Sequence, residues 1–435
     1  GRRTAQGVKK IKNTIDDIAS PVQSTFDINR PTIPRKIVSQ LDLNKWQHDF
    51  IQKNFLPFQS LTKEKRDAQA TEPQHFENGT TNQKWKQSRE NKISGTKASK
   101  LTNLHDYTTF EEGLRDILWD NFQIKLKRNP AIAWKVKWGH DLEPKAAATA
   151  LEFFNSKTGK TFLNQFSKNV KFPCLKVKHK EYGFVQSIAL PFIGSSPDGV
   201  MECTYEDGTV RRHAIEFKCK TKGWLKNEWP TNEWPQGPLY PVKQMPNNLK
   251  LPIPTAYFVQ IMWCVLVMGK HDLKSLLNIK GYSKYYDAFR EYLEPHLKHA
   301  NSQFFGEDML DTSTHIMFGV WAPGNTDTPH QGEPEIYNQF CLNEETNVHE
   351  SIMVKCPSGC LNLTMVKYDH EFAIKTMQHA YYMWQTHWIP RLAMKKMGML
   401  LYDELDPPMN CYTDSESDTE SIESCFEEEK EENIM

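Results

Sequence analysis

The chain has 435 residues with 54 basic and 54 acidic side chains, but the two signs are unevenly distributed. Thirteen acidic residues and one Lys lie in residues 401–435, so the first 400 residues carry a net charge of +12, which suits a polyanionic partner. No apolar run has the length of a membrane helix, and the N-terminus lacks the apolar stretch of a signal peptide. We therefore expect no membrane partner and a nuclear or cytoplasmic protein whose nine cysteines are reduced thiols.

The sequence divides into three parts. Residues 1–80 are polar, basic and weakly periodic, which predicts a basic, poorly ordered N-terminal extension. Within it, Leu41–Phe58 has the spacing of one amphipathic helix, and Ser60–Thr80 has the composition of a linker. Residues 81–400 hold the patterned sequence. Residues 401–435 are too acidic and too poor in apolar side chains to fold alone, so we expect a disordered tail.

The first patterned segment runs from Trp85 to Thr96 and carries Arg89. A guanidinium group binds phosphate bidentately, and hydroxyl groups at the start of a helix add further donors. A helix is predicted to begin near Thr96. The local alternative is therefore that the hydroxyls of this segment form an ordinary N-terminal helix cap.

Two helices and a basic strand are predicted next. Residues 107–128 and Trp138–Phe154 have the apolar spacing of helices, and Glu143 with Pro144 has the local pattern of a helix N-terminus. Residues 168–186 predict a basic strand or hairpin, whose lysines suit either a DNA backbone or a solvated sheet edge. The apolar run Ile188–Ile193 predicts a strand that leads into the following segment.

Residues 194–220 predict a β-hairpin. Apolar and polar residues alternate on both sides of residues 206–208, and Asp-Gly supplies the turn. With a three-residue loop and Gly208 in the left-handed conformation, Tyr205 pairs with Thr209.

That register places Asp198 opposite Glu216 and on the same sheet face as Lys218, whereas a two-residue loop would send Asp198 to the other face. Two adjacent carboxylates repel each other unless a cation lies between them, and hard oxygen ligands favour Mg²⁺ or Mn²⁺. A nearby lysine can orient or deprotonate a water, or bind a phosphate oxygen, as phosphodiester hydrolysis requires. The alternative is a strand-capping Asp198 beside a solvated edge.

The remaining segments are an insertion and two helices. Residues 222–252 predict a long irregular insertion, either a DNA-facing loop or a packing excursion. Residues 256–269 are apolar apart from Gln260, which predicts a buried helix whose Gln needs hydrogen-bond partners. Residues 368–392 predict a long amphipathic helix with a packing role.

Together these segments resemble the lambda exonuclease and YqaJ-type viral recombinase family of the PD-(D/E)XK nuclease superfamily. The most specific match is Ser196-Pro197-Asp198-Gly199 followed by Glu216-x-Lys218. The other matching segments, in chain order, are Trp85-x₃-Arg89 through Thr96, Gly139-x₃-Glu143 through Phe154, Tyr257-x-x-Gln260 through Gly269, and Tyr368-Asp369-x-x-Phe372 through Pro390-x-Leu392.

The resemblance implies an α/β fold with a restriction-endonuclease-like core, in which a mixed central β-sheet is flanked by helices. It implies that Asp198 and Glu216 bind the metal ion and that Glu143 assists as an additional ligand. Lys218 and Gln260 are expected to position the nucleophile.

The family also binds a 5′-terminal phosphate in a pocket built by its first motif. By resemblance, Arg89, Thr96 and Ser196 bind that phosphate in this chain. The expected activity is a Mg²⁺-dependent deoxyribonuclease, a 5′→3′ exonuclease on double-stranded DNA ends that serves recombination, repair or viral DNA processing. The alternatives are a structure-specific endonuclease on the same site and a non-catalytic DNA-binding module. A single-strand annealing protein and further copies of the chain are the partners that the resemblance leaves open.

Overall fold

A computed structural model of the chain describes a set of residues that belong to one compact unit, Val38–Met435. The described residues are 40–58, 61–76, 80–106, 108–121, 126–128, 130–166, 172–219, 240–241, 250–251, 253–298, 304–305, 309–310, 315–324, 330–341, 348–397 and 411–413. The first 39 residues, most of the predicted insertion and most of the acidic tail lie outside them.

The helices and strands are as follows. The helices are α2 (Gln40–Asn54), α3 (Lys63–Thr71), α4 (Gln83–Ser88), α5 (Gly95–Leu101), α6 (Phe110–Asn121), α7 (Pro130–Asn155), α8 (Lys157–Asn164), α9 (Thr255–Met268), α10 (Ser275–Asn278), α11 (Ser283–Leu297), α12 (His370–Met383) and α13 (Ile389–Lys396). The strands are β1 (Leu126–Arg128), β2 (Cys174–Lys180), β3 (Val185–Gln186), β4 (Gly194–Ser195), β5 (Gly199–Tyr205), β6 (Val210–Cys219), β7 (Tyr240–Pro241), β8 (Lys250–Leu251), β9 (His271–Asp272), β10 (Phe304–Phe305), β11 (Ile316–Ala322), β12 (Glu335–Cys341), β13 (Val348–Cys356), β14 (Gly359–Val366) and β15 (Cys411–Thr413).

The fold is α/β with a mixed central sheet flanked by helices, which confirms the predicted class. Seven strands form the sheet in the order β12-β13-β14-β11-β6-β5-β2. Strands β11 and β6 are parallel and the other pairs are antiparallel. The basic strand β2 lies at the edge of this sheet, beside β5.

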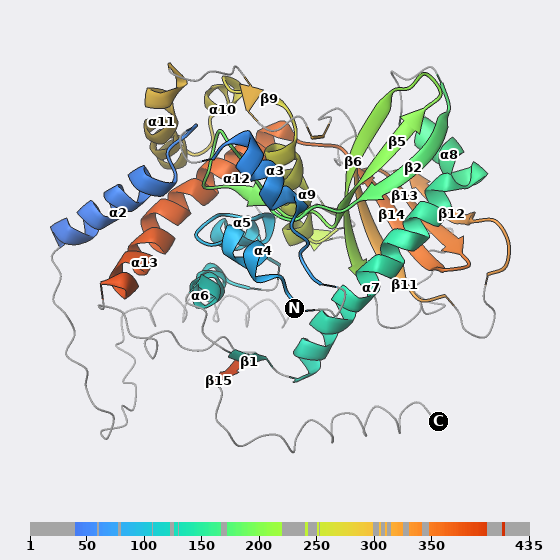
Figure 1. Cartoon of the computed structure of the whole chain (residues 1–435), viewed down its shortest axis with the longest axis horizontal. Coiled ribbons are helices and arrows are strands. Elements are labelled where there is room, and N and C mark those ends of the chain that lie inside the picture. Colours follow the sequence, from blue (N-terminus) through green and yellow to red (C-terminus); the bar gives the residue numbers. More distant parts are fainter. Residues whose placement is uncertain are drawn as a thin grey trace, which may run out of the picture. The chain divides into compact units, whose positions relative to one another are not determined.

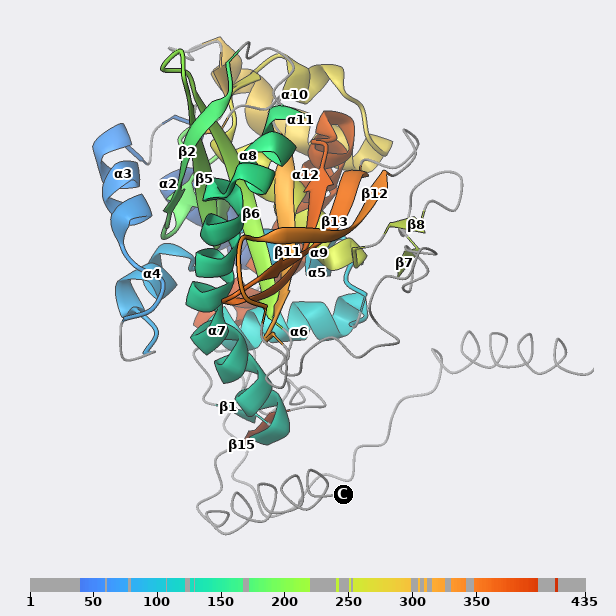
Figure 2. The same ribbon diagram turned by 90° about the vertical axis from the view of Figure 1, so that its right-hand side faces the viewer.

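The two faces of the sheet are covered by different helices (Figure 1). Helices α7 and α8 pack on one face, where Ile215 and Phe217 of β6 join the core. Helix α9 packs on the other with α5 and α12, where Ala214 joins a second core. Figure 2 shows α7 in front of the sheet and α9 and α5 behind it. Because side chains alternate along a strand, the residues of β6 are divided between two cores.

Two helices, α2 and α3, lie within residues 1–80, the segment predicted to be a poorly ordered extension. Helix α2 matches the amphipathic helix predicted over Leu41–Phe58, and its Ile51 is buried. The stretch predicted to be a linker, Ser60–Thr80, instead contains α3, whose Ala70 is buried. The Gly183 amide donates to the Ala70 carbonyl (2.8 Å), so tertiary contacts stabilise this polar segment.

Helix α7 begins at Pro130 and continues through Pro144 to Asn155. The prediction that Glu143 and Pro144 lie at a helix N-terminus is therefore wrong. A proline inside a helix removes one backbone hydrogen bond. Pro144 is exposed to solvent, and the flanking Leu142 and Ala146 are buried against the sheet, which holds the helix together across the proline.

The apolar run Ile188–Ile193 forms a buried turn, which corrects its prediction as a strand. The hydroxyl of Ser187 accepts a hydrogen bond from the Leu190 amide (3.0 Å), and buried Gln186 donates to the Pro191 carbonyl (2.8 Å). The predicted helix over residues 107–128 is also shorter, because α6 ends at Asn121.

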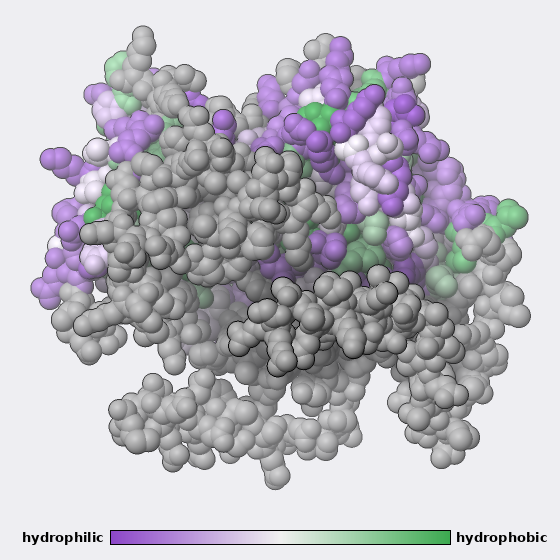
Figure 3. All heavy atoms as spheres, turned by 180° about the vertical axis from the view of Figure 1, so that it is seen from behind, coloured by the Kyte–Doolittle hydropathy of each residue, from purple (hydrophilic) through white to green (hydrophobic). Residues whose placement is uncertain are grey.

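The C-terminal helices have the packing role expected of residues 368–392. The Asp369 side chain caps α12 by accepting from the Phe372 amide (2.9 Å). A π-helical turn, Trp384–Trp388, joins α12 to α13, and Leu392 is buried in the core. Viewed from behind, the described surface is mostly hydrophilic (Figure 3). None of the described helices combines the length and apolar character needed to cross a membrane.

The hairpin loop offers a test of the backbone conformation at its turn. Gly208 has φ +83°, and a Cβ there would meet nothing within 4 Å, so Gly208→Ala should cost only the strain of the left-handed backbone. We expect it to lower the free energy of unfolding by about 1 kcal/mol. Gly139→Ala in α7, whose added Cβ also meets nothing within 4 Å, should instead raise it by about 1 kcal/mol. Thermal denaturation midpoints that shift in the same direction would contradict this account.

Candidate active site

The β5–β6 hairpin brings two carboxylates together. Gly199 pairs with Ile215 and Thr204 with Val210, the three-residue register that places Asp198 opposite Glu216. At the turn, the Tyr205 amide donates to the Thr209 carbonyl (2.8 Å). The register predicted for the three-residue loop is therefore confirmed.

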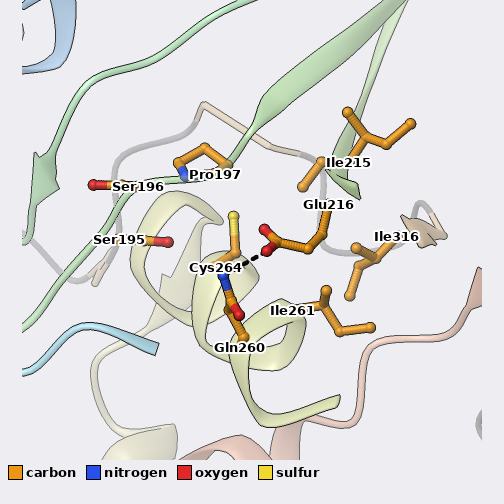
Figure 4. Close-up of a pocket in the computed structure, with 10 residues that line it drawn as sticks. Ser195, Ser196, Pro197, Ile215, Glu216, Gln260, Ile261, Cys264 and Ile316 are labelled. Carbon is orange, nitrogen blue, oxygen red and sulfur yellow. Dashed lines mark hydrogen bonds between the residues drawn. The ribbon is translucent and has the colours of Figure 1, made fainter. Parts of the chain in front are cut away.

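Glu216 is almost completely buried, with 4% of the residue exposed. Its Oε1 atom accepts hydrogen bonds from Lys218 Nζ (2.5 Å) and from Gln260 Nε2 (2.6 Å). Figure 4 shows Glu216 and Gln260 pointing toward each other beside Ser195, Ser196 and Pro197. Gln260 was expected to be buried but is partly exposed, and the hydrogen-bond partner expected for it is a residue of the predicted site.

Lys218 is fixed from two sides. Its ammonium group contacts Glu216 and lies 4.8 Å from the centroid of the Tyr257 ring on α9, and its side chain is 31% exposed. Although burial opposes the charged form, Glu216 and Asp198 raise the pKa of Lys218 above its usual value. Lys218 is therefore a protonated donor at neutral pH. Tyr257 belongs to one of the sequence motifs, but no sequence signal indicated this contact.

Asp198 lies at the start of β5, where its Oδ2 atom accepts a hydrogen bond from the Phe217 amide (2.7 Å). Burial first, and then the negative charge of Glu216, raise the pKa of Asp198 well above its usual value. Burial also raises the pKa of Glu216, while Lys218 and Gln260 act in the opposite direction. The two carboxylates therefore disfavour each other's ionised form when only Lys218 balances them.

Glu143 lies on α7 and lines the same cavity as Asp198. Its charge contributes to the raised pKa of both Asp198 and Glu216, which indicates that it faces the same site. Its side chain is 35% exposed and lies 3.6 Å from His140 Nδ1. Among the residues that the structure describes, no three His, Cys, Asp or Glu side chains form a metal-binding cluster. The structure thus assembles Asp198 and Glu216 as a pair and leaves Glu143 beside them.

The donor set fits a small, hard divalent cation. The hydrogen bonds within the described part of the chain engage Oδ2 of Asp198 and Oε1 of Glu216, which leaves one oxygen of each carboxylate for a cation. Burial raises the pKa of the Cys219 and Cys264 thiols to about 12, so they stay protonated near neutral pH. Carboxylate oxygens without thiolates favour Mg²⁺ or Mn²⁺ over softer metals.

The predicted phosphate-binding residues are only partly assembled. The Arg89 guanidinium carbon lies 4.3 Å from the centroid of the Trp85 ring, and Trp85 Nε1 donates to Ser196 Oγ (3.1 Å). Trp85 therefore links Arg89 to the Ser196-Pro197-Asp198 segment, a role that its place in the motif did not reveal. Thr96 is exposed in the first turn of α5, and Ser94 precedes that helix without a side-chain capping bond.

Helices α5 and α9 pack closely beside the site. A Cβ atom at Gly95 would lie 2.9 Å from the Cα atom of Gln260, so only glycine permits this approach. The Trp263 indole donates to the Gly194 carbonyl (3.2 Å), which fixes α9 to the segment that leads to Asp198. The helix that carries Gln260 is thus positioned by contacts on both sides.

Comparison with known families identifies the domain that carries these residues. Residues 84–271 match the family model of the YqaJ-like viral recombinase domain. The matched range contains all the predicted site residues, from Arg89 to Gln260, whereas residues 368–392 lie beyond it. No curated protein matches the chain. Residues 84–271 are therefore similar to the YqaJ-like viral recombinase domain, the family that the sequence motifs predicted.

Proposed function

We propose that this protein is a metal-dependent deoxyribonuclease that digests double-stranded DNA from free 5′ ends. The observation that carries the proposal is the cluster of Asp198, which directly precedes β5, with Glu216 and Lys218 of β6 and Gln260 of α9, in which Glu216 is buried. A DNA substrate and a role in recombination agree with the YqaJ-like domain. The net charge of +12 in the first 400 residues suits DNA as well.

In the proposed reaction, Asp198 and Glu216 hold Mg²⁺, for which Mn²⁺ can substitute, and Glu143 assists from α7. The bound cation would supply Lewis-acid activation of the scissile phosphate and neutralise part of its charge. Lys218, which is protonated, donates a hydrogen bond to the phosphate oxygen or to the attacking water. Gln260 holds Glu216 in place and can orient the same water.

The preference for a 5′ end rests on a second group of residues. Arg89, stacked on Trp85, and Ser196, held by the same indole, would bind the terminal phosphate, with Thr96 adding a hydroxyl. Ser196 is two residues from Asp198, so the terminal phosphate would be bound close to the catalytic carboxylates. An enzyme with this arrangement should digest linear duplex in the presence of Mg²⁺ but not EDTA, and should spare closed circular duplex.

Metal binding can be tested without an activity assay. The pKa of Asp198 is higher in the folded protein than in the unfolded chain. Folding is therefore most favourable at a pH below the unfolded pKa, where Asp198 is protonated in both states. This stability is lost as pH rises through the folded pKa. Asp198→Asn keeps an oxygen for the Phe217 amide and removes the charge. In EDTA it should raise the midpoint of thermal unfolding at neutral pH, and the difference should disappear near pH 4.

Added Mg²⁺ should raise the midpoint of the wild-type protein and leave that of Asp198→Asn unchanged. Equal stabilisation of both proteins by Mg²⁺ would contradict the assignment of Asp198 as a ligand.

In the proposed reaction, catalysis depends on the charges of Glu216 and Lys218. Glu216→Gln and Lys218→Met should each lower the cleavage rate of linear duplex by about 100-fold or more, because each removes a group that holds the cation or balances charge at the phosphate. DNA binding measured in EDTA should change little, since backbone contacts remain. Lys367→Met removes an exposed lysine outside the site and serves as the matched control. Full activity in Glu216→Gln would refute the site.

Recognition of the 5′ phosphate is tested at Arg89. Arg89→Ala should slow digestion of 5′-phosphorylated linear duplex by about tenfold to a hundredfold, the usual cost of losing a hydrogen bond to a charged group. It should also lose the preference for phosphorylated over 5′-hydroxyl ends. Arg89→Lys should restore only part of the rate, because lysine lacks the planar fork that stacks on Trp85. Arg212→Ala, at the partly exposed N-terminal end of β6, is the control for a lost positive charge.

If the wild-type protein cuts closed circular duplex as readily as linear duplex, or ignores the 5′ phosphate, the endonuclease alternative replaces the exonuclease.

A further inference from the structure

A cavity of about 710 Å³ opens beside the candidate active site. Its walls come from residues 71–76 between α3 and α4, from α7, and from the end of β2 with the residues that follow it. Asp198 and Glu143 line the cavity at the catalytic end, and His75 and His140 line it as well. Its volume lies within the range of pockets that hold small organic ligands, and it can accommodate one nucleotide.

Side chains of the cavity wall lie between the two groups of site residues. The His75 ring lies 5.8 Å from the Trp85 ring, which carries Arg89 and holds Ser196. The His140 ring lies 4.4 Å from the His75 ring, between centroids, and its Nδ1 atom is 3.6 Å from Glu143. A continuous line of side chains therefore leads from the proposed binding site of the terminal phosphate to the carboxylates.

The wall that carries His75 precedes the YqaJ-like domain and is fixed to the catalytic segment. Gln74 Nε2 donates to the carbonyls of Tyr182 and Pro197, each at 3.0 Å. The Asn82 amide donates to the Gln74 carbonyl (3.0 Å). Pro197 is the neighbour of Asp198, so these bonds set the position of His75 relative to the active site.

The negative charge of the cavity favours binding of a nucleobase over binding of a phosphate group. Its described lining includes five carboxylates, from Glu72, Asp141, Glu143, Glu181 and Asp198, against a single lysine, Lys137. Carboxylates repel phosphate groups, but they accept hydrogen bonds from the N–H groups of nucleobases. The imidazole rings and the half-exposed Phe76 ring offer surfaces on which a base can stack.

We propose that this cavity binds the base of the 5′-terminal nucleotide of the substrate, and that His75 and His140 are positioning residues which stack on it. The inference rests on the proposed exonuclease function. The terminal phosphate is then bound by Arg89 and Ser196, the scissile phosphate lies at Asp198 and Glu216, and the nucleoside between these phosphates occupies the cavity. Neither phosphate needs to enter the acidic lining.

The test compares two 5′-phosphorylated duplexes that differ only in the terminal nucleotide, which is either normal or an abasic tetrahydrofuran. Release of the first 5′-labelled product is measured in a single turnover with Mg²⁺. The wild-type protein should release the abasic residue about fivefold to a hundredfold more slowly, the range expected for the loss of one stacked base. Equal rates on the two duplexes would overturn the proposal.

Variants of the histidines give the second arm. His75→Ala and His140→Ala, on different elements, should slow release of the normal nucleotide by a similar factor and leave the abasic rate unchanged. His75→Phe should restore the normal rate, because a phenyl ring stacks but neither binds metal nor transfers protons. His48→Ala, exposed on α2, is the matched control. If both histidine variants retain the wild-type melting temperature and slow both substrates equally, the base contact is refuted.

The outcome also separates this proposal from the function on which it rests. If the wild-type protein releases no nucleotide from either duplex in Mg²⁺, the exonuclease function fails and the base site falls with it. If it releases both at the same rate, the exonuclease stands and only the base site is wrong.

Discussion

A carboxylate that is 4% exposed needs partners, because an isolated buried charge would cost several kcal/mol, and Glu216 has two of them from different elements. Lys218 comes from the same strand, and Gln260 comes from α9. Gln260 can reach Glu216 only because α9 is held close to the sheet, and Gly95 allows α5 to pack directly against it. The hydrogen bonds that stabilise the buried charge of Glu216 thus require β6, α9 and α5 to be correctly placed together.

The same arrangement makes the ionised carboxylates of the site electrostatically unfavourable. Burial raises the pKa of Asp198 and Glu216, the charge of Glu216 adds to the effect on Asp198, and Lys218 offsets only part of this cost. A fold that keeps two carboxylates in such contact gives up stability for a prearranged set of oxygen ligands. In the proposed function a divalent cation would stabilise the ionised carboxylates, so binding of the cation and stability of the fold are coupled.

The turn residues of the hairpin were compatible with a three-residue and a two-residue loop, because an Asp-Gly turn places Gly208 at positive φ in either. The three-residue loop was predicted because only that register brings Asp198 and Glu216 to one face. The sequence misjudged Pro144 and the stretch Ser60–Thr80, where contacts with distant residues decide the structure. A polar sequence became α3 because Ala70 is buried and its carbonyl is bound by Gly183, more than a hundred residues away. The stacking of Arg89 on Trp85 is a local contact between residues four apart at the end of α4, whereas the hydrogen bond from Trp85 to Ser196 depends on tertiary placement.

The boundary of the YqaJ-like domain does not coincide with the boundary of the active-site cavity. The domain begins at residue 84, yet residues 71–76 form one wall of the cavity and are tied to Pro197 through Gln74. A wall supplied from outside the matched residues can change the shape and charge of the cavity without altering the residues proposed to hold the cation. The acidic lining and the cationic Arg89 lie at different ends of the line formed by Trp85 and His75, and this separation of charge would orient an incoming nucleotide. Its phosphate would face Arg89, and its neutral base would face the carboxylates.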